Sequence, residues 1–312
     1  MAETQRGEGQ PSVAVVGAGA VGSFFGGMLA RAGASVTLLG RPGATSPHLD
    51  ATARQGLTID GIEIREVIPV AVSRNLEDLQ QADLVLFAVK TLDTETAARS
   101  IAPHLGPRSV VVSLQNGVDN VERMLAEGVR ALPSVVFVAA EIETAGTVRH
   151  RGRGDLILGP GNDPAAAAAV SEQFEAAGVP CPVSTNFARE QWTKLIINAM
   201  ANAISALGGA SYRALADYRP TWELAVTAAR EAAAVAERLG VELDVGEVIQ
   251  SAHGIAMTVG DATSSMEQDI ARGRRTEIGS LNGFISRRGA ELGVPTPTHD
   301  ALAALVGLRE HR

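Results

Sequence analysis

The stretch Pro11–Arg41, which reads PSVAVVGAGAVGSFFGGMLARAGASVTLLGR, decides the fold class of this chain. It opens with a short apolar run, passes a glycine-rich turn and continues with apolar residues at helical spacing. A second short apolar run, Val36–Leu39, closes the stretch. The change from strand spacing to helix spacing and back predicts a strand–helix–strand unit.

The turn inside this unit holds Gly17, Gly19 and Gly22 in the pattern GxGxxG. The pattern alone is a weak signal, but a strand before it and a helix after it are the context of dinucleotide-binding sites. The first glycine permits a tight turn, the second lets a pyrophosphate approach the backbone, and the third lets helix and strand pack closely. We therefore expect a dinucleotide site, rather than a turn without a ligand, at Gly17, Ala18, Gly19, Ala20, Val21 and Gly22.

The end of the second strand indicates which dinucleotide binds. An acidic side chain there would bond the ribose 2′-hydroxyl of NAD. This strand ends TLLGRPG, without Asp or Glu, and Arg41 follows Gly22 by nineteen residues. Because a guanidinium group pairs well with a phosphate dianion, Arg41 favours NADP(H). The alternative is an arginine that is only solvated at the surface.

Two polar residues follow later apolar runs. Lys90 ends DLVLFAVK, and Asn116 lies in QNG just past SVVVSL. Ligands of open parallel sheets bind outside the carboxyl ends of the strands, so both residues are candidates for contact with cofactor or substrate. Each could also be an ordinary turn residue or helix cap.

The pattern along the chain predicts a tail and two domains. Residues 1–10 read as a disordered tail rather than a signal peptide. Residues 11–185 alternate strands and helices and predict an NADP-binding Rossmann domain. Residues 186–312 show helix after helix, including one over 264–293. The expected fold class is an α/β Rossmann-type N-terminal domain followed by an all-α C-terminal domain.

Three local features are expected within the first domain. The segment LTIDGIEIREVIPV reads as a hairpin that turns at Asp60-Gly61. Residues 146–160 alternate around a glycine-rich turn, which suggests an antiparallel pair at the sheet edge. Residues 179–184, VPCPVS, read as a last strand.

The amino-acid composition narrows the classes of protein to which this chain could belong. The chain has 312 residues, of which 46% are hydrophobic, so two domains can each bury a core. A formal net charge of -8 argues against sequence-independent binding of nucleic acid. The single cysteine, Cys181, allows no internal disulfide, makes a cysteine-based metal site unexpected and is interpreted as a packing residue. No stretch resembles a membrane span, so we expect a cytoplasmic protein.

The segment Trp192–Leu207, WTKLIINAMANAISAL, has helical period but carries polar residues four apart. Lys194, Asn198 and Asn202 would share one side of that helix. A buried amide without a partner costs about 1–3 kcal/mol, and a lone buried ammonium costs more. The stripe is therefore either a wall of donors that faces a small polar molecule, or Lys194 reaches solvent while the amides bond neighbouring helices.

A second polar cluster lies in SSMEQDIARGRRTEIGSLNG, residues 264–283. Ser265 and Asp269 are four apart and would share a helix face, and Glu277 lies eight residues beyond Asp269. Gly273 between them can bend or break the helix. Spacing alone leaves the roles of Ser265 and Glu277 open.

These motifs together resemble the ketopantoate reductase (2-dehydropantoate 2-reductase) family over nearly the whole chain after the tail. The resemblance is carried by GAGAVG, the Lys90 strand end, QNG, KLIINAMAN and SSMEQDIARGRRTEIGSLNGF. It implies reduction of ketopantoate to D-pantoate with NADPH, a step toward pantothenate and coenzyme A. It also implies a Rossmann domain followed by a helical domain, with the active site between them.

The resemblance also implies a role for each candidate residue. Lys194 matches the catalytic lysine, which would act as general acid toward the ketone oxygen, and Glu277 matches the active-site glutamate. Substrate-binding positions match Asn116, Asn198, Asn202 and Ser265. Cofactor positions match the glycine motif, Arg41, Lys90, Asn116 and Glu277.

The sequence departs from the family pattern at one position and leaves alternatives open. Tyr212 stands where some members carry an asparagine, so another 2-oxo acid is an alternative substrate. A non-catalytic NADP(H)-sensing protein is a further alternative, because fold alone does not imply catalysis. The expected partner is a small 2-oxo acid, with no nucleic acid and no membrane, and a homodimer is one arrangement left open.

Overall fold

The structure is a computed structural model that describes residues 11–62 and 64–311. The chain divides into two compact units, Met1–Phe187 and Ala188–Arg312, and each is described by itself. The residues of the expected tail lie outside the described part of the chain. Across that described part, no helix combines the length and apolarity needed to cross a membrane.

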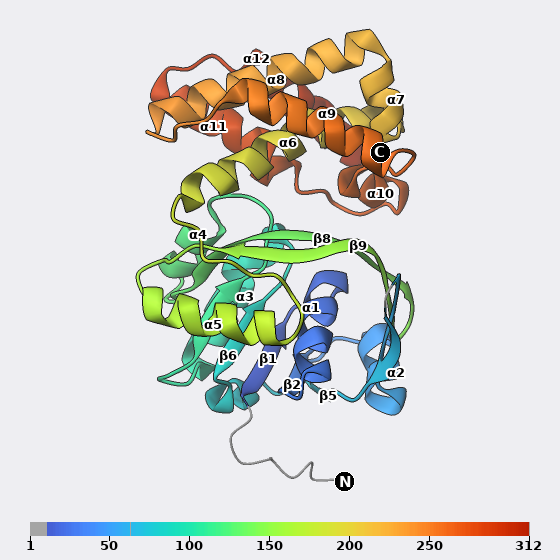
Figure 1. Cartoon of the computed structure of the whole chain (residues 1–312), viewed down its shortest axis with the longest axis vertical. Helices are drawn as coiled ribbons and strands as arrows, with labels where there is room; N and C mark the ends of the chain where they lie inside the picture. The colour runs from blue at the N-terminus through green and yellow to red at the C-terminus, as the bar shows by residue number, and fades with distance from the viewer. Residues whose placement is uncertain (1–10, 63, 312) are drawn as a thin grey trace. The chain divides into compact units, whose positions relative to one another are not determined.

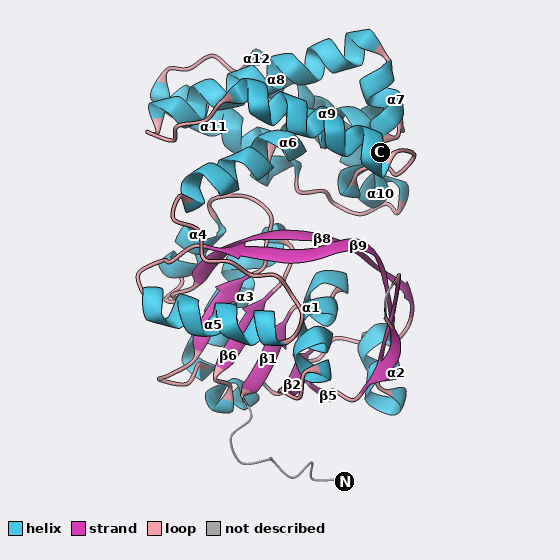
Figure 2. Ribbon diagram, in the orientation of Figure 1, coloured by secondary structure: helices cyan, strands magenta, loops and turns pink. Residues whose placement is uncertain are grey.

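The first unit is built on one large sheet (Figures 1 and 2). Across the sheet the strand order is β4-β3-β9-β8-β7-β6-β1-β2-β5. The five strands from β7 to β5 are all parallel, which confirms the Rossmann-type prediction. The strand bounds are β1 Ser12–Val16, β2 Ser35–Leu39, β3 Leu57–Gly61, β4 Arg65–Ile68, β5 Ala71–Ser73, β6 Leu84–Phe87, β7 Val110–Ser113, β8 Leu132–Thr144 and β9 Thr147–Leu158.

Helix α1 lies between two parts of this sheet. A Cβ on Gly26 would lie 2.7 Å from the Val15 side chain in β1, whereas one on Gly27 would lie 2.7 Å from the Ile59 side chain in β3. The adjacent glycines thus let one helix approach strands on two sides. The helices and 3-10 turns of the unit are α1 Ala20–Arg31, α2 Pro47–Gln55, η1 Leu76–Gln81, η2 Thr91–Asp93, α3 Thr94–Ile101, η3 Ala102–His104, α4 Asn120–Ala126 and α5 Pro164–Ala176.

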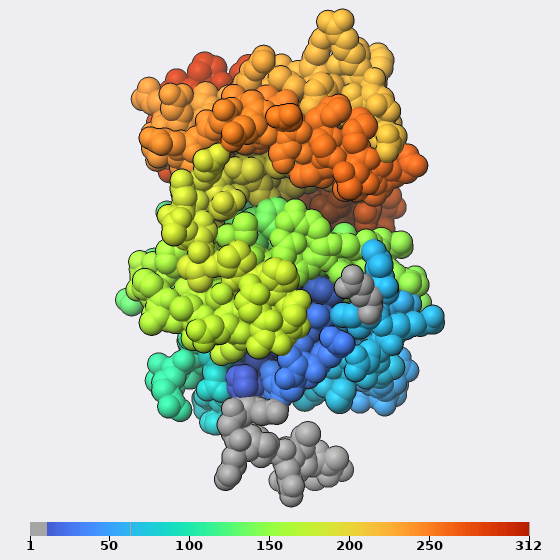
Figure 3. All heavy atoms as spheres, viewed as in Figure 1, coloured from blue at the N-terminus to red at the C-terminus, as the bar shows by residue number. Residues whose placement is uncertain are grey.

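Helix α5 covers the same face of the sheet as α1. In Figure 1 it passes in front of β6 and β1, and its atoms hide those strands in the space-filling view of Figure 3. Phe25 of α1 and Phe174 of α5 meet edge to face, with ring centroids 6.1 Å apart. Cys181 is buried in the same core, and burial raises the pKa of its thiol to about 12, so it is a packing residue as predicted.

Two local predictions differ from the structure. The hairpin of β3 and β4 is confirmed, but Asp60 pairs with Arg65, so Asp60 and Gly61 end β3 instead of forming the turn. Residues 146–160 do not fold back on themselves. They contribute the single strand β9, which pairs with β8 on one side and β3 on the other, and which therefore lies inside the sheet.

The expected strand at 179–184 is reduced to an isolated bridge between Leu158 and Val183. The segment runs beside β9, because the Leu158 N–H donates to the Pro182 carbonyl at 2.9 Å and the Ser184 N–H donates to Leu158 at 2.8 Å. Pro180 and Pro182 have no N–H, so they cannot donate to a regular ladder.

All regular elements among the described residues of the second unit are helices, joined by loops, as predicted (Figure 2). The helix expected over 264–293 is divided into three pieces, because the chain leaves the helical conformation at Gly273, where φ is 62°, and again at Leu281, where φ is -106° and ψ is -96°. The elements are α6 Phe187–Gly208, α7 Tyr212–Asp217, α8 Arg219–Arg238, α9 Val245–Val259, α10 Ser265–Ala271, η4 Ile278–Ser280, α11 Asn282–Leu292 and α12 Pro297–Glu310.

Candidate functional site

The three motif glycines between β1 and α1 meet different surroundings. A Cβ on Gly17, where φ is +96°, would lie 2.5 Å from Val89 N, and one on Gly22 would lie 2.4 Å from Gly17 O. The fold itself therefore requires these two glycines. A Cβ on Gly19 would meet nothing within 4 Å, so packing does not explain this glycine. Open space before a helix N-terminus is what an approaching pyrophosphate needs.

The start of α1 also suits an anion. No side chain caps this helix, and its first turn contains no acidic residue. Positive charge from the aligned peptide dipoles is therefore not offset locally. Ala18, Ala20 and Val21 are partly exposed, so the loop from Gly17 to Gly22 is accessible. The loop thus offers the open space and the local charge that a pyrophosphate would require.

The predicted residues of the first unit converge on one edge of the sheet. From β1 the chain passes to β2 beside it, forms β3 and β4 at the other end of the strand order, and then adds β5 beside β2. It continues to β6 and β7 on the other side of β1. Ligands bind at such a reversal of strand order, beyond the carboxyl ends of the strands. The glycine loop, Arg41, Lys90 and Asn116 follow β1, β2, β6 and β7 respectively, so the fold gathers all four at this edge.

Arg41 has a partner that the sequence did not suggest. Its Nη2 donates to Asp93 Oδ2 at 3.3 Å, and the two side chains are 72% and 49% exposed. Asp93 ends η2 and lies 52 residues further along the chain, so no local pattern links it to Arg41. An exposed pair contributes about 0–1 kcal/mol. The contact is therefore weak enough for a 2′-phosphate to replace it.

Lys90 and Asn116 lie beyond their strands rather than at the strand ends. Lys90 is exposed and directly precedes η2. Asn116 is half-buried, and its carbonyl accepts from Thr91 Oγ1 at 3.2 Å and from Asn120 Nδ2 at 2.5 Å. These bonds fix the Asn116 backbone against the loop that carries Lys90, so the two candidates have a common scaffold.

Gln115, next to Asn116, locks the same two loops together. It is buried, and its Nε2 donates to Val89 O at 3.1 Å and to Thr94 Oγ1 at 2.8 Å. Its Oε1 accepts from Ser113 Oγ at 3.1 Å. The motif QNG contains Gln115, but its letters do not show what the glutamine does. Only the tertiary structure shows that Gln115 joins the two loops, whereas Asn116 remains the candidate site residue.

In the second unit, the polar stripe lies along α6 at the predicted spacing. Lys194 and Asn198 are half-buried, whereas Asn202 is only 3% exposed. Asn202 Oδ1 accepts from Tyr212 Oη at 3.0 Å. Burial raises the pKa of Tyr212 to about 12, so its hydroxyl is a neutral donor at ordinary pH. The deepest amide of the stripe therefore has a protein partner, which was one of the two alternatives left open.

The two neighbouring serines at the start of α10 have different surroundings. Ser264 is buried, and its Oγ accepts from Glu267 N at 3.0 Å and donates to Asn202 O at 3.2 Å. The Ser264 N–H donates to Ser205 Oγ at 3.2 Å. Ser265, the predicted substrate residue, is exposed. Ser264 caps α10 and bonds α10 to α6. The hydroxyl of Ser265 does not belong to this set of bonds.

Glu277 is half-buried and directly precedes η4, where its carbonyl accepts from Ser280 N at 2.9 Å. The chain then enters α11, whose Asn282 donates from Nδ2 to Ala199 O of α6 at 2.9 Å. The candidates of the second unit thus lie on α6 or on segments bonded to it. These candidates are Lys194, Asn198, Asn202, Ser265 and Glu277.

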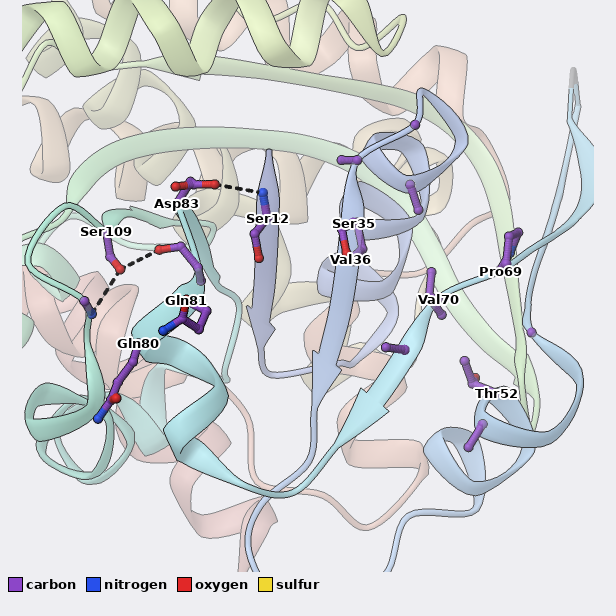
Figure 4. A pocket seen from close by; sticks show the side chains of 18 of the residues that line it. Ser12, Ser35, Val36, Thr52, Pro69, Val70, Gln80, Gln81, Asp83 and Ser109 are labelled. Carbon is purple, nitrogen blue, oxygen red and sulfur yellow. Dashed lines mark hydrogen bonds between the residues drawn. The ribbon is translucent and has the colours of Figure 1, made fainter. Parts of the chain in front are cut away.

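A cavity of about 1140 Å³ lies at the opposite edge of the first unit's sheet (Figure 4). It is lined near the amino ends of the strands, where the Ser12 N–H donates to Asp83 Oδ2 at 3.0 Å and Ser109 Oγ donates to Ala82 O at 2.6 Å. None of the predicted site residues lines it. The size of this cavity is therefore no evidence for or against a ligand site at the edge that carries the glycine loop.

Comparison with known proteins covers nearly the whole chain. Residues 13–163 match the family model "Ketopantoate reductase PanE/ApbA", and residues 186–310 match the model of its C-terminal part. The 2-dehydropantoate 2-reductase of Halobacterium salinarum is 34% identical over 307 residues, which cover 96% of this chain and 98% of that protein.

Two solved structures are similar over the same extent. A PanE/ApbA family ketopantoate reductase from Ralstonia eutropha JMP134 has a TM-score of 0.88 and 40% identity, covering 96% of this chain and 98% of that one. D-mandelate dehydrogenase, in a ternary structure with NADH and anilino(oxo)acetate, has a TM-score of 0.87 and 28% identity, with the same coverage.

Proposed function

Because this chain belongs to the ketopantoate reductase family, whose members are oxidoreductases, we propose that it is an NADPH-dependent 2-dehydropantoate 2-reductase. It reduces ketopantoate to D-pantoate, and in this role it serves the biosynthesis of pantothenate and coenzyme A. The proposal draws on the family membership, the glycine loop and the polar stripe of α6.

One observation about residue usage carries the proposal. The chain contains 27 lysines and arginines, yet only Lys90 and Lys194 are lysines. Arginine cannot give up a proton in a protein, whereas a lysine ammonium can. Lysine is thus confined to two positions, both of them candidate site residues. We assign the proton-donating role to Lys194.

The cofactor site is proposed at the carboxyl edge of β1. The N–H groups of the loop from Gly17 to Gly22 would hold the pyrophosphate, and Arg41 would hold the 2′-phosphate. Lys90 and Asn116 would contact the remaining part of the dinucleotide. When bound there, NADPH supplies the hydride for reduction of a ketone.

The second unit supplies the polar groups for a 2-oxo acid. Charge builds on the ketone oxygen during reduction, so Lys194 would stabilise it by a hydrogen bond and then donate a proton. Ser265 would donate to the substrate carboxylate, and the amides of Asn198 and Asn202 would bond a distal hydroxyl. Glu277 would orient the lysine or accept from a substrate hydroxyl.

The test uses Lys194→Ala and Lys194→Arg, with Arg219→Ala as a control at an exposed ion pair. Both Lys194 variants should bind NADPH as the wild type does, but should lose about 10²–10⁴-fold in kcat because the general acid is gone. Turnover is followed by absorbance of NADPH with ketopantoate as substrate. Wild-type protein without turnover, or a Lys194→Arg variant with full turnover, would overturn the proposal.

A second candidate keeps the chemistry and changes the substrate to another 2-oxo acid. The similarity to D-mandelate dehydrogenase and the bond from Tyr212 to Asn202 favour it, because that hydroxyl occupies one amide oxygen of the stripe. Comparing kcat/KM for ketopantoate with that for 2-oxo acids with aromatic or plain branched chains separates the two candidates. A substrate that exceeds ketopantoate by more than about tenfold, roughly 1.4 kcal/mol, would establish the second.

A further inference from the structure

The last turn of α12 places two charged side chains against two different segments of the second unit. Arg309 Nη1 donates to Ala206 O at 2.5 Å and to Leu207 O at 2.8 Å. These carbonyls belong to the last turn of α6, which ends at Gly208. Arg309 therefore fixes the far end of the helix that carries the polar stripe.

The next residue, Glu310, binds the segment that carries Glu277. Its Oε1 accepts from Thr276 N at 2.7 Å and also from Thr276 Oγ1. Thr276 is 2% exposed, and its Oγ1 in turn accepts from Ile278 N at 3.2 Å. The backbone on both sides of Glu277 is thus held by one network that begins at the Glu310 carboxylate.

Helix stability does not explain an acidic residue at this position. The C-terminal end of a helix carries partial negative charge, so a glutamate there is unfavourable, whereas Arg309 suits it. Without Glu310, the buried Thr276 N–H would lose its acceptor, which destabilises a buried donor. The acidic side chain is therefore explained by its bonds to Thr276 and not by its own helix.

The other end of α12 is anchored as well. The Glu231 carboxylate of α8 accepts from Thr298 N at 3.0 Å and from Thr298 Oγ1 at 2.6 Å. In addition, His299 Nε2 donates to Ala228 O of α8 at 2.8 Å. Helix α12 is therefore fixed to α8 at its start. This anchoring also fixes the positions of Arg309 and Glu310 at its other end.

We propose that Arg309 and Glu310 are positioning residues that hold α6 and the Glu277 segment in a set relation to each other. The inference rests on the proposed function, in which α6 and Glu277 act on one substrate. Catalysis is sensitive to the placement of such groups, since a displacement of about 1 Å can cost about 10²-fold in rate. Glu310 acts through Thr276, whose N–H and hydroxyl both donate to it and whose hydroxyl in turn accepts from the Ile278 N–H.

The test compares Glu310→Ala with Glu310→Gln, which keeps an acceptor oxygen, and with Glu291→Ala, which removes an exposed carboxylate paired to Arg288 on α11. In Glu310→Ala the amide hydrogens of Thr276 and Ile278 should exchange at least about tenfold faster, and kcat should fall at least about tenfold. Glu310→Gln should recover most of both losses, and Glu291→Ala should match the wild type.

A double-mutant cycle with Glu277→Gln separates positioning from general destabilisation. If Glu310 acts through Glu277, Glu310→Ala should lower kcat much less in the Glu277→Gln background than in the wild type. Equal losses in both backgrounds, or a folded Glu310→Ala with wild-type kcat, would overturn the inference. If Glu310→Ala does not fold, the same cycle is run with Glu310→Asp, whose shorter side chain withdraws the carboxylate from Thr276.

Failure of the proposed function gives a different result. Wild-type protein would then reduce no 2-oxo acid, while the exchange rates of the Thr276 and Ile278 amides would still report on the bonds to Glu310. Unchanged exchange in Glu310→Ala would overturn the positioning network itself, whatever the substrate.

Discussion

Gly19 and Gly22 belong to one motif, yet their replacement by alanine should have opposite consequences. In Gly19→Ala the new methyl group meets no atom within 4 Å, so the thermal midpoint should stay near that of the wild type. NADPH binding should weaken, because the methyl group takes the space that the pyrophosphate needs. In Gly22→Ala the Cβ would lie 2.4 Å from Gly17 O, so the thermal midpoint should fall. A Gly19→Ala protein with wild-type affinity in an NADPH titration would place the cofactor elsewhere.

Arg41 should decide between NADPH and NADH. Among the described residues, its side chain bonds Asp93 in an exposed and weak pair. Arg41→Glu would remove the partner of the 2′-phosphate and add a like charge. A hydrogen bond to a charged group contributes about 1.5–3 kcal/mol, so the ratio of kcat/KM for NADPH over NADH should fall at least about tenfold. Arg31→Ala, which breaks an exposed pair with Glu66, is the control. An unchanged ratio in Arg41→Glu would show that the arginine does not read the 2′-phosphate.

At the scale of the element, the start of α10 yields a pair of matched variants. Ser264→Ala removes the cap of α10 and the bond to Asn202 O, so it should lower the free energy of unfolding by about 0.5–2 kcal/mol. Ser265→Ala should leave stability unchanged within about 0.5 kcal/mol but raise KM for the 2-oxo acid, because its hydroxyl is exposed and proposed to meet the carboxylate. Urea unfolding measures the effect on stability, and steady-state kinetics measures the effect on KM. If Ser265→Ala lowered stability and Ser264→Ala only raised KM, Ser264 would be the substrate residue and Ser265 the structural one.

Elements whose signals are local were predicted well. The β1–α1–β2 unit and the helix α6 were both predicted from the spacing of apolar residues within short stretches of the chain. Elements that depend on a distant partner were not. Strand β9 was expected to fold on itself, because alternation and glycines do not reveal that β8 and β3 lie on its two sides.

At the scale of the whole molecule, two buried histidines, one in each unit, should reduce the stability of the folded state at acid pH. His48 Nδ1 accepts from Gly146 N at 3.1 Å, and His299 Nε2 donates to Ala228 O at 2.8 Å while its Nδ1 lies 3.1 Å from Asn282 Nδ2. In each ring one nitrogen is therefore an acceptor and the ring is neutral. Burial lowers the pKa of both histidines below the ordinary value, and for His299 the backbone bond and two carboxylates oppose this only in part.

Stability should therefore decline as the pH falls. The unfolded chain takes up protons first, so the contribution of both histidines is complete above about pH 6.5 and is lost as the pH falls toward their lowered pKa values. Urea unfolding between about pH 5 and pH 8 should show this slope, and His48→Gln and His299→Gln should each reduce it. His311→Gln, at an exposed histidine, should leave the slope unchanged. If His48→Gln and His299→Gln both kept the wild-type slope, the loss of stability at low pH would have to come from other groups.

The sequence by itself determined the Rossmann-type fold, the helical second unit, the glycine loop and the spacing of Lys194, Asn198 and Asn202. Each of these depends on residues within one or two elements, where chain connectivity fixes the geometry. Only the tertiary structure decided that Asp93 faces Arg41, that Tyr212 bonds Asn202, and that Glu310 holds the backbone beside Glu277. Those contacts join side chains that packing brings together from separate elements, and no local pattern encodes which residues will meet.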